Sequence, residues 1–356
     1  MLLEKTINEI GSLDSESIKN ARRRVDSLIK PPGSLGRLEE IAVQLAGIQG
    51  RALPVVNKKT VILMAGDHGV VSEGVSVAPQ EITYQMLSAF TGGVAGIGVL
   101  SRHAGAGLVV VDVGVARKVD VPGVLDYKVR EGTGNIAEGP AMTREEAVRA
   151  IEAGIKVAMD EIEKGGDLLA TGDMGIGNTT PSSAILAALA GVSAEEAAGR
   201  GTLVNDEVLE RKTITIKKAI EINRPDPDDG IDVVAKVGGL EIAGLAGVIL
   251  GAASRKVAVI IDGFISTAAA MIACAISKDA INYIIPSHLS GEQGHRMMLE
   301  HLGIKPMLHM DMRLGEGTGA VLAMNLVEAA CKIAAEMASF EQAGVSDLDE
   351  EMILNS

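Results

Sequence analysis

Residues 167–189 read Asp-Leu-Leu-Ala-Thr-Gly-Asp-Met-Gly-Ile-Gly-Asn-Thr-Thr-Pro-Ser-Ser-Ala-Ile-Leu-Ala-Ala-Leu. The apolar start, 167–171, predicts a strand, and the alanine-rich end, 181–189, predicts a helix. Between them, 172–180 is a glycine-rich turn that leads into the first turn of that helix. A strand, a tight turn and a helix in this order are typical of an α/β fold.

The turn itself has the chemistry of an anion site. Glycines let the backbone approach a ligand closely, and the N–H groups that open a helix attract negative charge. Asn178 and two threonines add further donors. The turn lacks the lysine of a P-loop and the Gly-x-Gly-x-x-Gly spacing of a dinucleotide site, so a single phosphate ester is the expected ligand. The alternative is an ordinary tight connection between a strand and a helix.

The same layout recurs along the chain. Short runs rich in Val, Ile and Leu are expected to be strands buried on both faces of a parallel sheet; they are Thr60–Ala65, Leu108–Val113, Asp167–Thr171, Val257–Ile261, Ala280–Pro286 and Met307–Asp311. Helical spacing at 144–163 and 207–222 separates some of them. We therefore expect a doubly wound, mostly parallel sheet of about six strands. Polar, glycine-bearing segments follow each run, where ligands bind in such sheets.

The two ends of the chain differ from the middle. Helix-like stretches occur at 15–28 and 36–48, and a strong alanine-rich helical pattern covers 320–340. We expect residues 1–50 and 320–356 to form a small helical subdomain with an acidic tail, beside a nucleotide-binding α/β domain at 51–319.

Composition excludes several classes of function. The chain has 356 residues, 47 acidic against 33 basic, for a net charge of −14, with three Tyr, three Phe and no Trp. Nucleic-acid binding is not expected, because the negative net charge does not attract phosphates and the chain has few aromatic side chains on which bases could stack. Apolar runs are too broken to span a membrane, and the start lacks the layout of a signal peptide. Two cysteines in apolar segments, Cys274 and Cys331, suit a reducing cytoplasm.

Seven motifs follow one another along the chain: Lys30-Pro-Pro-Gly-Ser-Leu-Gly-Arg-Leu38, Ala65-Gly-Asp-His-Gly-Val70, Gly175-Ile-Gly-Asn-Thr-Thr180, Gly238-Gly-Leu-Glu-Ile242, Asp262-Gly-Phe264, Ser287-His288 and Arg313-Leu-Gly-Glu-Gly-Thr-Gly319. Together they resemble the nicotinate-nucleotide:dimethylbenzimidazole phosphoribosyltransferase family of cobalamin nucleotide-loop assembly, over roughly 30–344. The resemblance implies that nicotinate mononucleotide gives its ribosyl phosphate to 5,6-dimethylbenzimidazole, forming α-ribazole 5′-phosphate and nicotinate. It also implies a homodimer.

This reaction needs one base. The pyridinium leaving group neutralises its own charge, whereas the attacking base must lose an N–H proton. A single carboxylate suffices, so no metal or cofactor is expected. Glu316 matches the family's base, and Gly315 and Gly317 leave room beside it for a flat ring. Glu316 could otherwise be a solvated turn residue.

The resemblance also assigns the substrate-binding positions. Gly175, Gly177 and Thr179 match its nucleotide-binding turn, Lys212 and Ser290 match positions near the phosphate, and Gln85 and Leu314 match the benzimidazole slot. Asp173 and Ala89 depart from the family, which usually has glutamate and asparagine there. Asp173 is a second catalytic candidate, with a shorter reach toward the base or ribose. These departures put the preferred base, which can be a benzimidazole, a purine or a phenol, in question.

Two other classes of function stay open at this point. Five strand-end residues could converge on a metal and make a hydrolase: Asp67, His68, Asp112, Asp262 and His288. No His-x-x-x-His or Cys-x-x-Cys spacing favours that arrangement, and such residues commonly brace loops. A non-catalytic nucleotide or benzimidazole sensor is the other alternative, and the presence of Glu316 speaks against it.

Overall fold

The centre of the molecule is a parallel sheet. The structure, a computed structural model, describes residues 1–198 and 206–346. Six strands pair in the order β3-β2-β1-β4-β5-β6, and every neighbouring pair is parallel. They are β1 (Lys59–Gly66), β2 (Gly107–Gly114), β3 (Val124–Asp126), β4 (Leu168–Met174), β5 (Ala258–Ile261) and β6 (Ile284–Pro286). The expected doubly wound α/β fold is confirmed.

The strand order reverses between β1 and β4. The chain builds β1, β2 and β3 outward in one direction and then β4, β5 and β6 in the other. Such a reversal leaves a crevice beyond the carboxyl ends of the two central strands, where ligands bind. Both strands are apolar and buried because helices cover the sheet, and β1 is buried along its whole length.

Two strand predictions need correction, and one strand was missed. Ala280–Pro286 is a strand only at 284–286, because a 3-10 helix, η2 (Lys278–Tyr283), takes its first part. Met307–Asp311 does not join the main sheet, since only β8 (Leu308–His309) is extended and it pairs with β7 (His288–Leu289). The N–H groups of Met307 and Leu308 donate to the carbonyl of Ser287, which directs the segment away from β6. The short strand β3 was not predicted, because three residues carry too little periodicity.

Helices occupy the connections. Those predicted at 144–163 and 207–222 are confirmed as α6 and α9. The helices are α1 (Leu2–Glu9), α2 (Ser15–Asp26), α3 (Arg37–Gln49), α4 (Glu81–Thr91), α5 (Gly96–Ala104), α6 (Arg144–Glu163), α7 (Thr179–Ala190), α8 (Ala194–Ala197), α9 (Asp206–Asn223), α10 (Gly230–Val237), α11 (Leu240–Ser254), α12 (Phe264–Ile276), α13 (Gln293–Leu302), α14 (Thr318–Glu336) and α15 (Phe340–Ala343), with a 3-10 turn, η1 (Gly69–Glu73).

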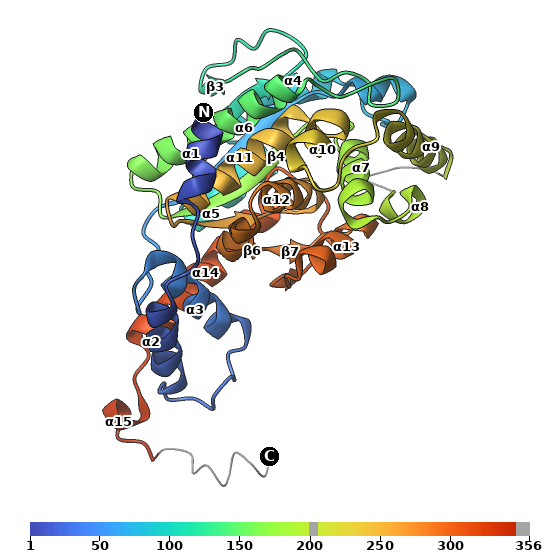
Figure 1. The fold of residues 1–356 in the computed structure, drawn as a ribbon. Coiled ribbons are helices and arrows are strands. Elements are labelled where there is room, and N and C mark those ends of the chain that lie inside the picture. Colours follow the sequence, from blue (N-terminus) through green and yellow to red (C-terminus); the bar gives the residue numbers. More distant parts are fainter. Residues whose placement is uncertain (199–205, 347–356) are drawn as a thin grey trace. The chain divides into compact units, whose positions relative to one another are not determined.

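Helices α6 and α11 lie side by side against the sheet (Figure 1). Glycines make their close contact possible. A Cβ at Gly154 would come within 1.8 Å of the carbonyl oxygen of Gly244, and one at Gly247 within 1.9 Å of the carbonyl oxygen of Ile151. No side chain fits at either position, so the two backbones touch directly and hold the face of the sheet rigid.

The chain divides into two compact units. Among the described residues, the first takes in 1–11, 58–198 and 206–323 and holds the whole main sheet, and the second takes in 12–57 and 324–346. In the first unit, the N–H of Leu3 in α1 donates to Oε1 of Glu152. In the second, the guanidinium of Arg24 donates to the carbonyls of Ala334 and Met337, which ties the two ends of the chain together.

One helix among the described residues, α14, is long and apolar enough to cross a membrane by length and composition. Its mean hydropathy is 1.3 over an 18-residue window, but 56% of that window is buried inside the molecule. A buried core helix has the same composition, so this helix is weak evidence for a membrane span.

Candidate active site

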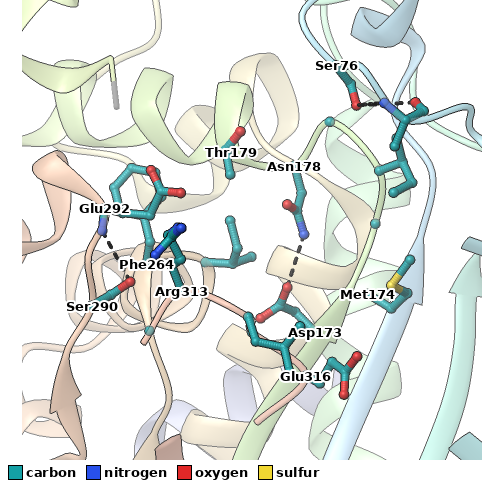
Figure 2. Close-up of a pocket in the computed structure, with 18 of the residues that line it drawn as sticks. Ser76, Asp173, Met174, Asn178, Thr179, Phe264, Ser290, Glu292, Arg313 and Glu316 are labelled. Atoms are coloured by element: carbon teal, nitrogen blue, oxygen red, sulfur yellow. Dashed lines mark hydrogen bonds between the residues drawn. The ribbon is translucent and has the colours of Figure 1, made fainter. Parts of the chain in front are cut away.

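A pocket of about 340 Å³ lies at the carboxyl end of the sheet (Figure 2). Its walls come from the segments that follow β1, β4, β5 and β6, so it occupies the crevice that the strand order creates. The lining consists of 75–78, 173–179, 263–265 and 313–316, together with Ile82, Met86, His288, Ser290 and Glu292.

The glycine-rich turn forms one wall of this pocket. Gly175, Gly177, Asn178 and Thr179 all line it, and Thr179 opens α7. Gly177 has φ +88°, in the left-handed region that favours glycine. A Cβ at Gly175 would meet the carbonyl oxygen of Gly66 at 2.4 Å, so only glycine lets the turn lie against β1. The structure therefore places backbone groups and a helix N-terminus where they can bind an anion.

Asp173 lies at the base of the turn. Its Oδ2 accepts a hydrogen bond from Nδ2 of Asn178 at 3.1 Å (Figure 2). Burial raises the pKa of Asp173 to about 8, and the negative charges of Asp262, Glu241 and Glu316 act in the same direction. The hydrogen bond from Asn178 lowers it by a smaller amount. At neutral pH this carboxyl group is mainly protonated.

Glu316 is the second carboxyl group of the pocket. It is 7% exposed and has φ +63°, between Gly315 and Gly317, which also have positive φ. Its Oε2 accepts the N–H of Ile97 in the first turn of α5 at 3.1 Å. Burial raises the pKa of Glu316; the Ile97 hydrogen bond opposes this, and the charge of Asp262 adds to it. The result is a fixed, partly desolvated carboxylate with increased basicity.

Asp262 holds the loop that carries Glu316. Its carboxylate accepts the N–H groups of Gly317 at 3.1 Å, Gly319 at 2.8 Å and Ala320 at 3.0 Å. It thus satisfies donors at the N-terminus of α14 from the end of β5. Gly317, predicted as a binding residue, takes part in this support and does not line the pocket.

The strand-end Asp and His residues brace loops. Asp67 accepts the N–H of Ala116 at 2.8 Å, and Asp112 accepts the N–H groups of Gly114 and Val115. Nε2 of His68 lies 2.6 Å from Oε1 of Glu241, Nδ1 of His288 lies 2.9 Å from Oγ of Ser287, and Asp262 binds its loop as described above.

Within 1–198 and 206–346, no group of three or more such side chains is arranged to hold a metal ion. The geometry does not favour the metal-dependent hydrolase.

Ser290 lines the pocket opposite the turn and is held in place by a histidine. Its N–H donates to Nδ1 of His295 at 2.8 Å, so Nε2 of the ring carries the proton and donates to Oγ1 of Thr267 at 2.8 Å. Burial lowers the pKa of His295 to about 3, which keeps the ring neutral.

Besides Gly317, two predicted binding residues do not line the pocket. Lys212 is 1% exposed on α9; burial lowers its pKa to about 8, and the nearby charge of Glu292, which does line the pocket, acts in the opposite direction. Gln85 is exposed on α4. Leu314, the other predicted slot residue, lines the pocket and is 62% exposed.

Sequence reasoning missed part of the lining. Ile82 and Met86 stand four residues apart on α4, the spacing of one helix face, and Phe264 and Arg313 occur inside motifs of the family resemblance. The helical spacing was a usable signal. Which face of α4 meets the pocket depends on tertiary packing, which no local pattern contains.

Comparison with known proteins agrees with these observations. A family model described as Phosphoribosyltransferase matches residues 10–345. The nicotinate-nucleotide–dimethylbenzimidazole phosphoribosyltransferase of Chloroflexus aggregans is 54% identical over 98% of this chain and 99% of its own, and that of Desulforamulus reducens is 53% identical over 97% and 99%. The crystal structure of the Thermus thermophilus enzyme of the same name matches 94% of this chain and 100% of its own, with a TM-score of 0.90 and 46% identity.

Proposed function

Because the chain belongs to the nicotinate-nucleotide–dimethylbenzimidazole phosphoribosyltransferase family, we propose that Glu316 is the base of this transfer. The enzyme moves the 5-phosphoribosyl group of nicotinate mononucleotide to 5,6-dimethylbenzimidazole, giving α-ribazole 5′-phosphate and nicotinate for cobalamin synthesis. The observation that carries the assignment of Glu316 is its position in the pocket as a fixed, buried carboxylate with a raised pKa.

The chemistry requires little else. One ring nitrogen of dimethylbenzimidazole attacks C1′ of the ribose, and the proton on its other nitrogen passes to Glu316. The bond to nicotinate breaks at the same carbon, and its electron pair neutralises the pyridinium nitrogen. The N–H of Ile97 fixes one oxygen of Glu316, which leaves the other to take the proton.

Two carboxyl groups with different protonation states share the pocket. Asp173, with a pKa of about 8, holds its proton at neutral pH, so it adds no second negative charge beside Glu316. A neutral Asp173 can donate a hydrogen bond to the ribose or the incoming base. We assign it this supporting part, with Glu316 as the base.

The turn takes the phosphate. Gly175, Gly177, Asn178 and Thr179 present backbone and side-chain donors at the N-terminus of α7, and Ser290 faces them across the pocket. The resemblance implies that Lys212 lies near the same phosphate. Lys212 is buried and interacts with the charge of Glu292, which supports a lysine that acts on the phosphate through its charge and not a solvated surface residue.

The direct test is incubation of the enzyme with nicotinate mononucleotide and a panel of bases: benzimidazoles, purines and phenols. We expect release of nicotinate and a ribosylated 5,6-dimethylbenzimidazole phosphate of the corresponding mass. The panel also shows which base the enzyme prefers. If no base releases nicotinate above the enzyme-free control, the proposed activity is wrong.

Oligomeric state and location are further parts of the proposal. The family resemblance supports a homodimer, which light scattering of the purified protein tests; a monomeric mass would contradict it.

The free cysteines Cys274 and Cys331 suit a reducing compartment, and we place the enzyme in the cytoplasm. Cell fractionation tests this placement.

A further inference from the structure

One cationic side chain of the pocket has no part in the mechanism so far. Among the described residues that line the pocket, Arg313 carries the single guanidinium. Its Cβ and Cδ lie 3.8 Å from the position that a side chain on Gly291 would take, and the N–H of Gly291 donates to the carbonyl of Met312 at 2.9 Å. Arg313 therefore lies along the segment that joins Ser290 to Glu292.

Glu316 faces the other side. A Cβ built on Gly96, at the start of α5, would lie 3.3 Å from Oε2 of Glu316 and 3.1 Å from Cδ2 of Leu314. Figure 2 shows Arg313 on the side of Glu292 and Ser290, with Glu316 beyond Asp173 on the other side. The loop thus presents a base and a guanidinium to opposite sides of one pocket.

This separation matches the geometry of the reaction, and the inference rests on the function proposed above. In a direct displacement, the attacking nitrogen and the departing nitrogen lie on opposite faces of C1′. Glu316 takes the proton of the attacking ring, so the attacking ring lies on the side of Glu316. The departing nicotinate ring is then on the side of Arg313.

The charges of the lining also favour the nicotinate ring on the side of Arg313. Nicotinate mononucleotide has two anionic groups, a phosphate and a ring carboxylate. The acidic residues of the lining, Asp173, Glu292 and Glu316, cannot attract a carboxylate. An arginine binds one through two parallel hydrogen bonds, and the neutral amide of nicotinamide cannot accept both with the same strength. We propose that Arg313 binds the carboxylate of the nicotinate ring and selects nicotinate over nicotinamide nucleotides.

The test separates the two anions with small probes. Inhibition constants are measured for nicotinate, which has only the carboxylate, for nicotinamide, and for ribose 5-phosphate, which has only the phosphate. In Arg313→Gln, inhibition by nicotinate should weaken by about 10- to 100-fold, the range of a hydrogen bond to a charged group. Nicotinamide and ribose 5-phosphate should bind as in the wild type. Arg313→Lys should recover part of the loss, because it keeps the charge but not the paired geometry.

Two controls make the result specific. Arg296→Gln removes an exposed arginine of α13 that does not line the pocket, and nicotinate inhibition should not change. Lys212→Met should weaken ribose 5-phosphate and leave nicotinate unaffected. Circular dichroism establishes that each variant is folded.

Several results would overturn the inference. Unchanged nicotinate inhibition in a folded Arg313→Gln variant removes Arg313 from recognition. Loss for ribose 5-phosphate alone assigns it to the phosphate, and equal loss for all three probes indicates a general change of the pocket. A wild-type enzyme that releases no nicotinate in the presence of any base would instead contradict the proposed function, whatever Arg313 binds.

Discussion

At the scale of single residues, the chemistry depends on the different surroundings of two carboxyl groups. Glu316 has a backbone N–H on one oxygen, whereas Asp173 has an amide donor but also three neighbouring acidic side chains. A base must be ionised to work, and a backbone donor stabilises the ionised form. This difference makes Glu316 the residue whose loss should stop the reaction.

Glu316→Gln should lower kcat by about 10²- to 10⁴-fold, the usual contribution of a positioned base. Glutamine keeps the shape and an oxygen that can accept the N–H of Ile97, but it cannot take the proton. Steady-state kinetics with nicotinate mononucleotide should show an unchanged KM, because the phosphate is bound elsewhere. A change in KM alone would make Glu316 a binding residue, and near-normal turnover would move the role to Asp173.

Asp173→Asn should stabilise the protein above about pH 5. The folded pKa of about 8 is raised from 3.8, so the folded state keeps a proton that the unfolded chain loses. Stability supplied by that proton is present below pH 3.8 and falls as the pH rises toward 8. The asparagine variant avoids this loss, and we expect it to gain about 1–3 kcal/mol at pH 8, after allowing for relaxation around the charge. Thermal unfolding at pH 4 and pH 8 measures the difference; an equal effect at both would contradict the raised pKa.

At the scale of elements, the strand β4, the turn and the helix α7 act as one unit. The strand brings Asp173 to the pocket, the turn brings backbone donors, and the helix adds its N-terminus. The N–H of Ile176 also donates to Oγ1 of Thr83 in α4, which joins the turn to a second wall. The turn can bind an anion without rearranging because neighbouring elements fix it on both sides.

Gly177→Val should weaken nucleotide binding by about tenfold or more. A side chain at φ +88° costs about 1–2 kcal/mol, and its Cβ would approach Cγ2 of Val71 at 2.7 Å. The matched control is Gly191→Val at the end of α7, where φ is +68° and no atom lies within 4 Å of a Cβ. Both variants should lose the stability that a side chain at positive φ costs, and Gly177→Val should lose more because of the contact with Val71. Only Gly177→Val should raise the dissociation constant for nicotinate mononucleotide in calorimetry. Equal affinity in both would make the turn a simple connection.

The same elements show what the sequence can predict. The segment 167–189 could be predicted because its apolar run, turn residues and helix pattern are all local. The prediction of a main-sheet strand at 307–311 was wrong because this segment pairs with the residues that follow β6 and not with the sheet itself. That pairing depends on tertiary structure, which a local pattern does not contain. Arg313 was missed for a similar reason: its role depends on Gly291, 22 positions earlier, and nothing in the loop sequence identifies that neighbour.

At the scale of the whole molecule, the sheet creates the pocket before any catalytic residue is considered. The order β3-β2-β1-β4-β5-β6 opens a crevice beyond β1 and β4, and the loops that follow four strands fill its walls. The resemblance located the loops, and the strand runs located the edge of the sheet where they meet. The side of the pocket that each residue faces could only come from the packed structure, since it depends on contacts such as those of Gly96 and Gly291.

This arrangement also predicts that the reaction needs no divalent ion. Metal ions assist phosphoryl and acyl transfer by neutralising charge that develops on oxygen. Here the bond breaks at C1′ of the ribose, the phosphate stays a monoester throughout, and the leaving pyridinium becomes neutral as it departs. The N-terminus of α7 and the turn residues supply the donors for the phosphate. Turnover should therefore be unchanged after dialysis against EDTA, measured by nicotinate release with saturating dimethylbenzimidazole. Activity that disappears in EDTA and returns with Mg²⁺ or Zn²⁺ would show that a metal takes part. The carboxylates at the strand ends would then be the candidate metal ligands.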